Sequence, residues 1–145
     1  MAKQTTTWQE KFEDFFVKLP SLPKNWQQVL VKITPFFALI FGILGVLGGL
    51  AGLGIFSVFS PFLMGTGMNS VGGTFLGMLA AVVASALLLA AFPGTRMKKM
   101  QGWNMLFWSE VASLLSAFLS YSFVGGIIGA FIGFYILYQI KPYYK

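Results

Sequence analysis

One carboxyl group, that of Glu110, lies inside a long apolar stretch and is the first candidate for chemistry. The stretch GWNMLFWSEVASLLSAFLS, residues 102–120, has the length and composition of a membrane-spanning helix. A charge in the hydrocarbon costs about 2.5–3.5 kcal/mol, so this carboxyl should face other helices, be protonated, or both. Ser113 lies three residues further, on nearly the same helical face. Glu110 and Ser113 are therefore a candidate proton or cation site. The alternative is a structural carboxyl that bonds serines or backbone carbonyls, or reaches toward Lys98 and Lys99.

Other residue types narrow the chemistry further. The chain has no cysteine and no histidine, which excludes thiolate metal sites and removes the commonest general base. Met64 and Met68, in the segment SPFLMGTGMNSVGG, offer two thioethers, a weak signal for a soft metal. No phosphate-binding loop, paired carboxylates or nucleophile–base motif is present. We therefore expect no catalytic residues, no metal and no cofactor, and a protein that is not an enzyme.

The composition indicates where the protein resides. Of its 145 residues, 57% are hydrophobic and only 10% are charged, whereas soluble domains carry about a quarter charged residues. The charges gather before, between and after apolar segments, so the net charge of +6 indicates contact with lipid headgroups rather than nucleic acid. The sequence predicts an all-α integral membrane protein whose first partner is the lipid bilayer.

Four apolar segments are each long enough to cross a bilayer as a helix. They cover approximately residues 35–59, 71–92, 103–121 and 123–140. The last two are short and follow each other closely, so a tight turn at the membrane surface must join them. The sequence therefore predicts a polytopic bundle of four transmembrane helices over residues 34–145, preceded by a separate segment at the cytoplasmic face over residues 1–33.

The basic residues predict the orientation of these spans. Five lysines precede the first span, and two lysines follow the fourth. Arg96, Lys98 and Lys99 lie between the second and third spans, and the two remaining connections carry no charge. By the positive-inside rule, both termini and the central loop should be cytoplasmic, in a cytoplasmic (inner) membrane.

The N-terminal segment has the pattern of two short amphipathic helices separated by Pro20 and Pro23. Thr7 and Glu10 form a capping box at the start of the first helix. Aromatic residues on one helical face predict contact with the headgroup region, and the alternative is packing on the protein's own cytoplasmic face. The residues expected at the membrane interface are Trp8, Phe12, Phe15, Phe16, Trp26 and Trp103.

Small residues recur along one face of every predicted span. Helices in lipid associate through close packing, which small residues permit, so this pattern predicts tightly packed helices. An additional interpretation is that one glycine face stays free and forms a homo-oligomer or binds a membrane partner protein. The glycines expected to mediate packing are Gly42, Gly45, Gly49, Gly52, Gly73, Gly77, Gly125, Gly129 and Gly133.

Three stretches together resemble a known group of proteins: LPKNWQQVLVKITPFFALIFGILGVLG, AFPGTRMKKMQGWNMLFWSE and YILYQIKPYYK. They are similar to uncharacterised small four-span integral membrane proteins of candidate-phyla bacteria with reduced genomes. The resemblance covers most of the chain and implies a bacterial cytoplasmic membrane and a four-span fold, but no activity. Some members carry the name of chromate transporter, yet no Lys or Arg lies inside a span here.

Three functions are compatible with these patterns. The leading expectation is a structural, scaffold or accessory membrane protein that acts through glycine-mediated helix packing. The second is a small channel or transporter in which Glu110 binds a proton or cation. The third is lipid binding or curvature sensing by the amphipathic N-terminal helix.

Overall fold

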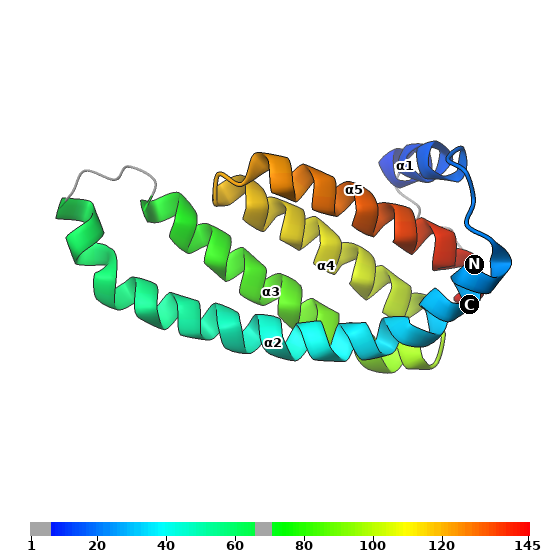
Figure 1. Ribbon diagram of the computed structural model, residues 1–145, viewed down its shortest axis with the longest axis horizontal. Coiled ribbons are helices and arrows are strands. Elements are labelled where there is room, and N and C mark those ends of the chain that lie inside the picture. The colour runs from blue at the N-terminus through cyan, green and yellow to red at the C-terminus, as the bar shows by residue number, and fades with distance from the viewer. Residues whose placement is uncertain (1–6, 66–70) are drawn as a thin grey trace.

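The computed structural model describes residues 7–65 and 71–145, except for the side chains of residues 7–9, 63, 64 and 71. In this part of the chain the structure is entirely helical, which confirms the predicted all-α class (Figure 1). The side chain of Trp8, the capping hydroxyl of Thr7 and the two methionines Met64 and Met68 lie outside the described residues. The helices are α1 (Thr7–Val17), α2 (Lys24–Gly65), α3 (Val71–Arg96), α4 (Met100–Leu119) and α5 (Phe123–Ile140), with a 3₁₀ turn over Lys141–Tyr143.

Among the described residues, three helices are long and apolar enough to cross a membrane, as expected of a membrane protein. They are Lys24–Phe62, Gly72–Arg96 and Phe123–Tyr143. The predicted third span corresponds to α4, whose hydropathy is lowered by Asn104, Glu110 and several serines. α4 is therefore the least apolar of the four long helices.

α2 is much longer than the span predicted over residues 35–59. The structure joins that span to the preceding segment in one helix of 42 residues, which passes through Pro35 and Pro61. A proline within a helix removes one backbone hydrogen bond and crowds the preceding turn, which is why the sequence suggested a break. Neighbouring helices can compensate for that loss within a membrane protein. The domain boundary predicted between residues 33 and 34 consequently lies inside a continuous helix.

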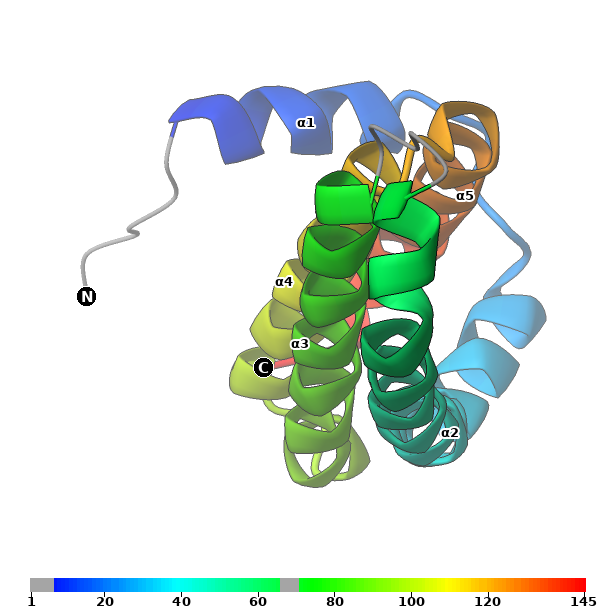
Figure 2. The same ribbon diagram turned by 90° about the vertical axis from the view of Figure 1, so that its left-hand side faces the viewer.

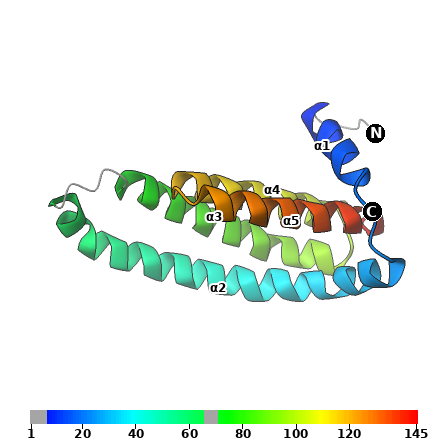
Figure 3. The same ribbon diagram turned by 45° about the horizontal axis from the view of Figure 1, so that its top comes forward.

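The long helices form two hairpins that lie side by side, and α1 crosses one end of them (Figures 1 and 2). α3 packs extensively against both α2 and α4, α4 packs less closely against α5, and α2 touches α5 at only a few positions. The helices thus form a curved row in the order α2, α3, α4, α5, which Figure 2 shows nearly end on, and Figure 3 shows α2 along one side of the other long helices. A groove remains between α2 and α5.

Most of the predicted packing glycines do lie against a neighbouring helix. At these positions an added Cβ would come closer than 3.0 Å to another helix or to the residue that follows it, so a larger residue would force the neighbouring atoms to move. Gly52 and Gly129, in contrast, face open space, and Gly125 meets only the Ser122 hydroxyl at 3.6 Å. The close positions are Gly42, Gly45 and Gly49 of α2 against α3, Gly73 and Gly77 of α3 near the end of α4, and Gly133 of α5 against α4.

Hydrogen bonds from serine side chains reinforce the contact between α3 and α4. Ser109 Oγ donates to the Ala84 carbonyl at 2.7 Å, and Ser116 Oγ donates to the Gly77 carbonyl at 2.7 Å. Such bonds between helices are each worth about 0.6 kcal/mol within a membrane protein. The serine face of α4 is therefore directed at α3.

The turn between α3 and α4 lies next to the C-terminal residues. The Lys145 amide donates to the Lys98 carbonyl at 2.9 Å, and the Met100 amide donates to the Lys145 carbonyl at 2.8 Å. Lys98 has a positive φ of 53°, which reverses the chain between the two helices. Arg96, Lys98 and Lys99 consequently share one end of the molecule with the C-terminal residues and the start of α2 (Figure 1).

Candidate functional site

Glu110 extends from α4 toward α5, where Gly133 leaves room for its carboxyl group. A Cβ added at Gly133 would lie 2.3 Å from Oε1 of Glu110 and 2.5 Å from its carboxyl carbon. The sequence suggested Glu110 as an ion site and Gly133 as a packing position, without a link between them. The structure brings the two together.

The Glu110 carboxyl is exposed to a groove of about 360 Å³ between α2, α4 and α5. The α2 wall is one helical face with the spacing i, i+3, i+4, i+7, i+8 and i+11, formed by Leu30, Ile33, Thr34, Phe37, Ala38 and Phe41. Leu88 of α3, Leu106 of α4 and the end of α5 complete the apolar lining. Glu110 is the one ionisable side chain among the described lining residues.

The groove gives Glu110 no internal partner. Within residues 7–65 and 71–145, no hydrogen bond or ion pair to its carboxyl is found, and the single ion pair there joins Glu13 to Lys141. Ser113, the expected companion, is exposed, while Ser109 and Ser116 donate to backbone carbonyls of α3. The carboxyl is therefore available to hold a proton or to bind a cation that enters the groove.

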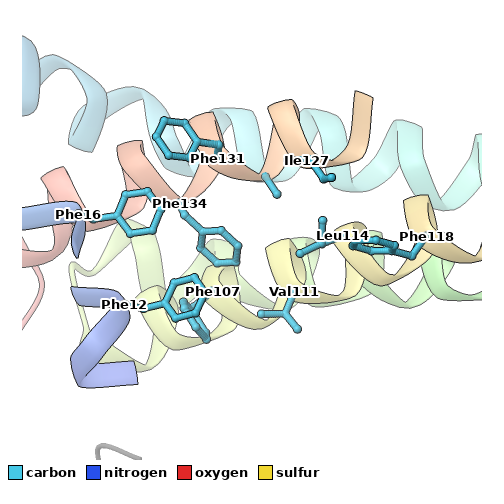
Figure 4. Close-up of a pocket in the computed structure, with 10 residues that line it drawn as sticks. Phe12, Phe16, Phe107, Val111, Leu114, Phe118, Ile127, Phe131 and Phe134 are labelled. Atoms are coloured by element: carbon cyan, nitrogen blue, oxygen red, sulfur yellow. The ribbon is translucent and has the colours of Figure 1, made fainter. Parts of the chain in front are cut away.

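A second groove of about 350 Å³ lies on the other side of α5, between α1, α4 and α5. Figure 4 shows Phe12 and Phe16 at one end of it and Phe118 and Ile127 toward the other. Its described lining is apolar throughout. It offers space of similar size but no polar group that would orient a ligand.

Phe16 and Trp103, both expected at the membrane interface, are instead part of the protein core. Phe16 is 3% exposed and stacks on Tyr138 of α5, with ring centroids 5.3 Å apart. Trp103 is 6% exposed, and its indole Nε1 donates to the Leu137 carbonyl at 2.8 Å. A buried indole needs such a partner, because an unpaired N–H in an apolar core is costly.

The other aromatic residues of this set remain accessible. Phe12, Phe15 and Trp26 are 46%, 56% and 63% exposed, respectively. The amphipathic face of α1 is thus divided: Phe16 is buried against α5, Phe12 lies 6.3 Å from the Phe134 ring of α5 but is half exposed, and Phe15 is exposed. Phe16 therefore packs on the protein itself, which was the alternative to contact with lipid headgroups.

An ion pair and aromatic rings fix α1 to α5. Lys141 Nζ pairs with Glu13 of α1 and lies 5.1 Å from the Trp103 ring and 5.8 Å from the Tyr138 ring. Cation–π contacts of this kind are each worth about 0.5–1 kcal/mol at exposed sites. Lys141, which the sequence suggested only as a topology signal, therefore helps to hold the N-terminal helix.

Polar side chains of the C-terminal segment hold the connection between α1 and α2. Gln139 Oε1 accepts hydrogen bonds from the Leu22 amide at 3.3 Å and from Gln27 Nε2 at 3.0 Å. Tyr135 donates to the Pro20 carbonyl, and Tyr143 donates to Gln27 Oε1 at 3.2 Å. Sequence reasoning missed these residues, although a buried glutamine at the end of the apolar α5 was an available signal.

Tyr144 is a buried tyrosine that lies near Thr34 of α2. It is 3% exposed, and its hydroxyl makes no well-aligned hydrogen bond to the described residues. Burial raises the pKa of Tyr144, and the nearby Thr34 hydroxyl opposes this in part. Thr34 already donates its proton to the Leu30 carbonyl at 2.6 Å, so burial is the larger influence.

In the described ranges no group of three or more Asp, Glu, His or Cys residues comes together. Comparison of the chain with protein-family models, curated proteins and solved structures finds no match.

Proposed function

We propose that this protein is a small channel or transporter of four membrane spans in which Glu110 binds a proton or a cation. The observation that supports this is the placement of the carboxyl in an apolar groove, beside Gly133 and without an internal partner. An ionisable group inside a membrane is costly and marks a functional position by default.

In this proposal α4 also crosses the membrane, as the third of the four spans along the chain. Its 20 residues would extend about 30 Å, which matches the hydrocarbon thickness of a bilayer. The polar residues Ser109 and Ser116 are satisfied by α3, and Glu110 is directed at α5, so they do not argue against a membrane setting. The basic residues at one end favour cytoplasmic termini by the positive-inside rule.

Glu110 has no second acid, base or nucleophile beside it in the described lining, which favours binding over catalysis. General acid–base or nucleophilic chemistry needs a partner within hydrogen-bond reach, and the described lining of the groove offers only the Thr34 hydroxyl besides Glu110. Thr34 is engaged with the Leu30 carbonyl. The carboxyl therefore suits reversible binding of a positive charge.

Flux in proteoliposomes tests this function. We expect proton or monovalent cation flux with the parent protein and its loss in Glu110→Gln, which keeps the size of the side chain. Ser113→Ala is the matched control, because Ser113 is exposed on the same helix and should leave the flux unchanged. Equal flux in the parent and in Glu110→Gln would refute the proposal.

A structural or accessory role is the second candidate, and it rests on the unfilled glycine positions. Gly52 of α2 and Gly129 of α5 have no side-chain or backbone neighbour within 4 Å of an added Cβ, so a further helix has room to approach there. Gly52→Leu and Gly129→Leu should then shift the protein from an oligomer toward a monomer in sedimentation experiments. A parent protein that is monomeric in a bilayer would eliminate self-association.

A further inference from the structure

We infer that the groove beside Glu110 binds a lipophilic organic cation, whose charge Glu110 neutralises while Phe37 and Phe41 contact its apolar groups. This inference rests on the proposed role of Glu110 as a cation site and names the class of cation. It follows from the lining, the aromatic rings at the opening and the charge of the groove.

The lining is unsuited to a hard divalent cation. Hard cations such as Ca²⁺ take six to eight oxygen ligands, and Mg²⁺ retains several waters in a polar site. Here the described lining supplies the carboxylate of Glu110 and one threonine hydroxyl, within about 360 Å³ of otherwise apolar space. An organic cation, whose charge is surrounded by hydrocarbon groups, needs no oxygen ligands and can fill such an apolar space.

Two aromatic rings lie at the accessible side of this groove. Phe37 and Phe41 are one helical turn apart on α2, and their rings stack with centroids 5.5 Å apart and an angle of 8°. They are 52% and 53% exposed, whereas Ala38 between them is 2% exposed and forms the floor. Aromatic faces attract organic ammonium groups, and a carboxylate in the same groove adds to that attraction.

The opening is lateral, between α2 and α5, because these helices touch at only a few positions. Its rim is apolar, so the ligand should reach Glu110 from within the bilayer. Lysine and arginine are missing from the described lining, and no second acid competes for the charge. The second groove, of similar size but without a charged residue, lacks this complementarity and provides an internal control.

Two probes of the same shape and opposite charge separate charge recognition from simple partitioning. Tetraphenylphosphonium and tetraphenylborate would be titrated into the purified full-length chain in a neutral detergent, with equilibrium dialysis as the readout. We expect saturable binding of tetraphenylphosphonium and no saturable binding of tetraphenylborate.

The variants test each wall of the groove. Glu110→Gln should weaken phosphonium binding roughly thirtyfold or more, as is usual when one partner of a buried charge pair is removed. Phe37→Leu and Phe41→Leu should each weaken it about two- to fivefold, since they keep the apolar volume and remove the ring. Phe12→Leu, in the second groove, is the matched control and should have no effect. Circular dichroism and size-exclusion chromatography verify folding, and the phenylalanine variants decide the matter if Glu110→Gln does not fold.

Each result has a defined meaning. Retained phosphonium binding in a folded Glu110→Gln variant, or equal binding of tetraphenylborate, overturns the inference. Absent phosphonium binding together with Glu110-dependent proton or sodium flux also overturns it, but leaves the proposed function intact. Absence of both refutes the inference and the proposed function.

Discussion

Replacement of Gly102 by alanine should destabilise the protein strongly, because this glycine of α4 lies directly against the backbone of α3. A Cβ at Gly102 would lie 2.3 Å from the Gly94 carbonyl carbon, 2.3 Å from the Thr95 nitrogen and 2.8 Å from the Gly94 Cα. These are backbone atoms, so no side-chain rotation relieves the clash. The turn that follows Gly94 is itself closed by a hydrogen bond from the Lys99 amide to the Gly94 carbonyl at 2.9 Å.

The magnitude follows from two opposing effects. Overpacking of a well-packed core costs typically about 1–3 kcal/mol, and a clash with backbone belongs at the upper end. The higher helix propensity of alanine returns up to about 1 kcal/mol. The net loss for Gly102→Ala should therefore be about 2 kcal/mol. Gly129→Ala is the matched control, because nothing lies within 4 Å of the added Cβ and only the propensity gain remains.

Unfolding of the two variants by sodium dodecyl sulfate in mixed micelles, followed by tryptophan fluorescence and circular dichroism, measures this difference. Trp103 follows Gly102 directly and is buried, so its emission should report separation of the helices. If Gly102→Ala and Gly129→Ala unfold at the same free energy, the argument from the α3–α4 approach is refuted.

Two further predictions concern the C-terminal segment. Lys141→Gln and Glu13→Gln should loosen α1 to a similar, small extent, because each removes the same partly exposed ion pair, worth at most about 1 kcal/mol. The cation–π contacts that Lys141→Gln also removes join Lys141 to Trp103 of α4 and Tyr138 of α5, not to α1. Faster hydrogen exchange confined to α1 in both variants would show this, and unchanged exchange in either variant would contradict it. Tyr144→Phe should reduce alkaline unfolding. Because burial raises the pKa of Tyr144, its contribution is complete below the ordinary tyrosine pKa of about 10 and is lost as the pH rises through the folded-state pKa. Across that pH range the melting temperature should fall less for Tyr144→Phe than for the parent protein. Near pH 7 the two proteins should melt at the same temperature.

The positions of the apolar helices were predictable because their ends carry clear signals. The predicted fourth span, residues 123–140, coincides with α5, where Ser122 and Lys141 bound a run without charged residues. The second span continues through Pro93 to Arg96, a difference of one helical turn. α2 was predicted poorly, since a proline such as Pro35 usually ends a helix and its tolerance here depends on neighbours that are remote in sequence.

The site was predictable only in part, because sequence gives residue types but not their partners. Glu110 stood out as an acid in an apolar helix, yet nothing in its local sequence indicated that Gly133 would face it. Phe16 and Trp103 have the pattern of membrane-facing aromatics, and a periodic apolar face cannot distinguish lipid from Tyr138 as its contact. Gly94 and Gly102 were not among the predicted packing glycines, because they flank the basic loop and lie outside the glycine pattern of the spans.

The length of α2 has a consequence for the surrounding bilayer. Its charge-free part, residues 33–65, has 33 residues and extends about 50 Å, against a hydrocarbon core of about 30 Å. Even at a tilt of about 40°, roughly 10 Å of this part extends past the core. The candidate span Phe123–Tyr143, which contains α5, has 21 residues and extends about 31 Å, close to the core thickness. In a membrane the hydrophobic mismatch is therefore uneven around the protein, because lipids beside α2 would stretch while those beside α5 would not. The preferred bilayer thickness would then be greater on the α2 side of the protein than on the α5 side, and lipids with longer acyl chains would be enriched beside α2.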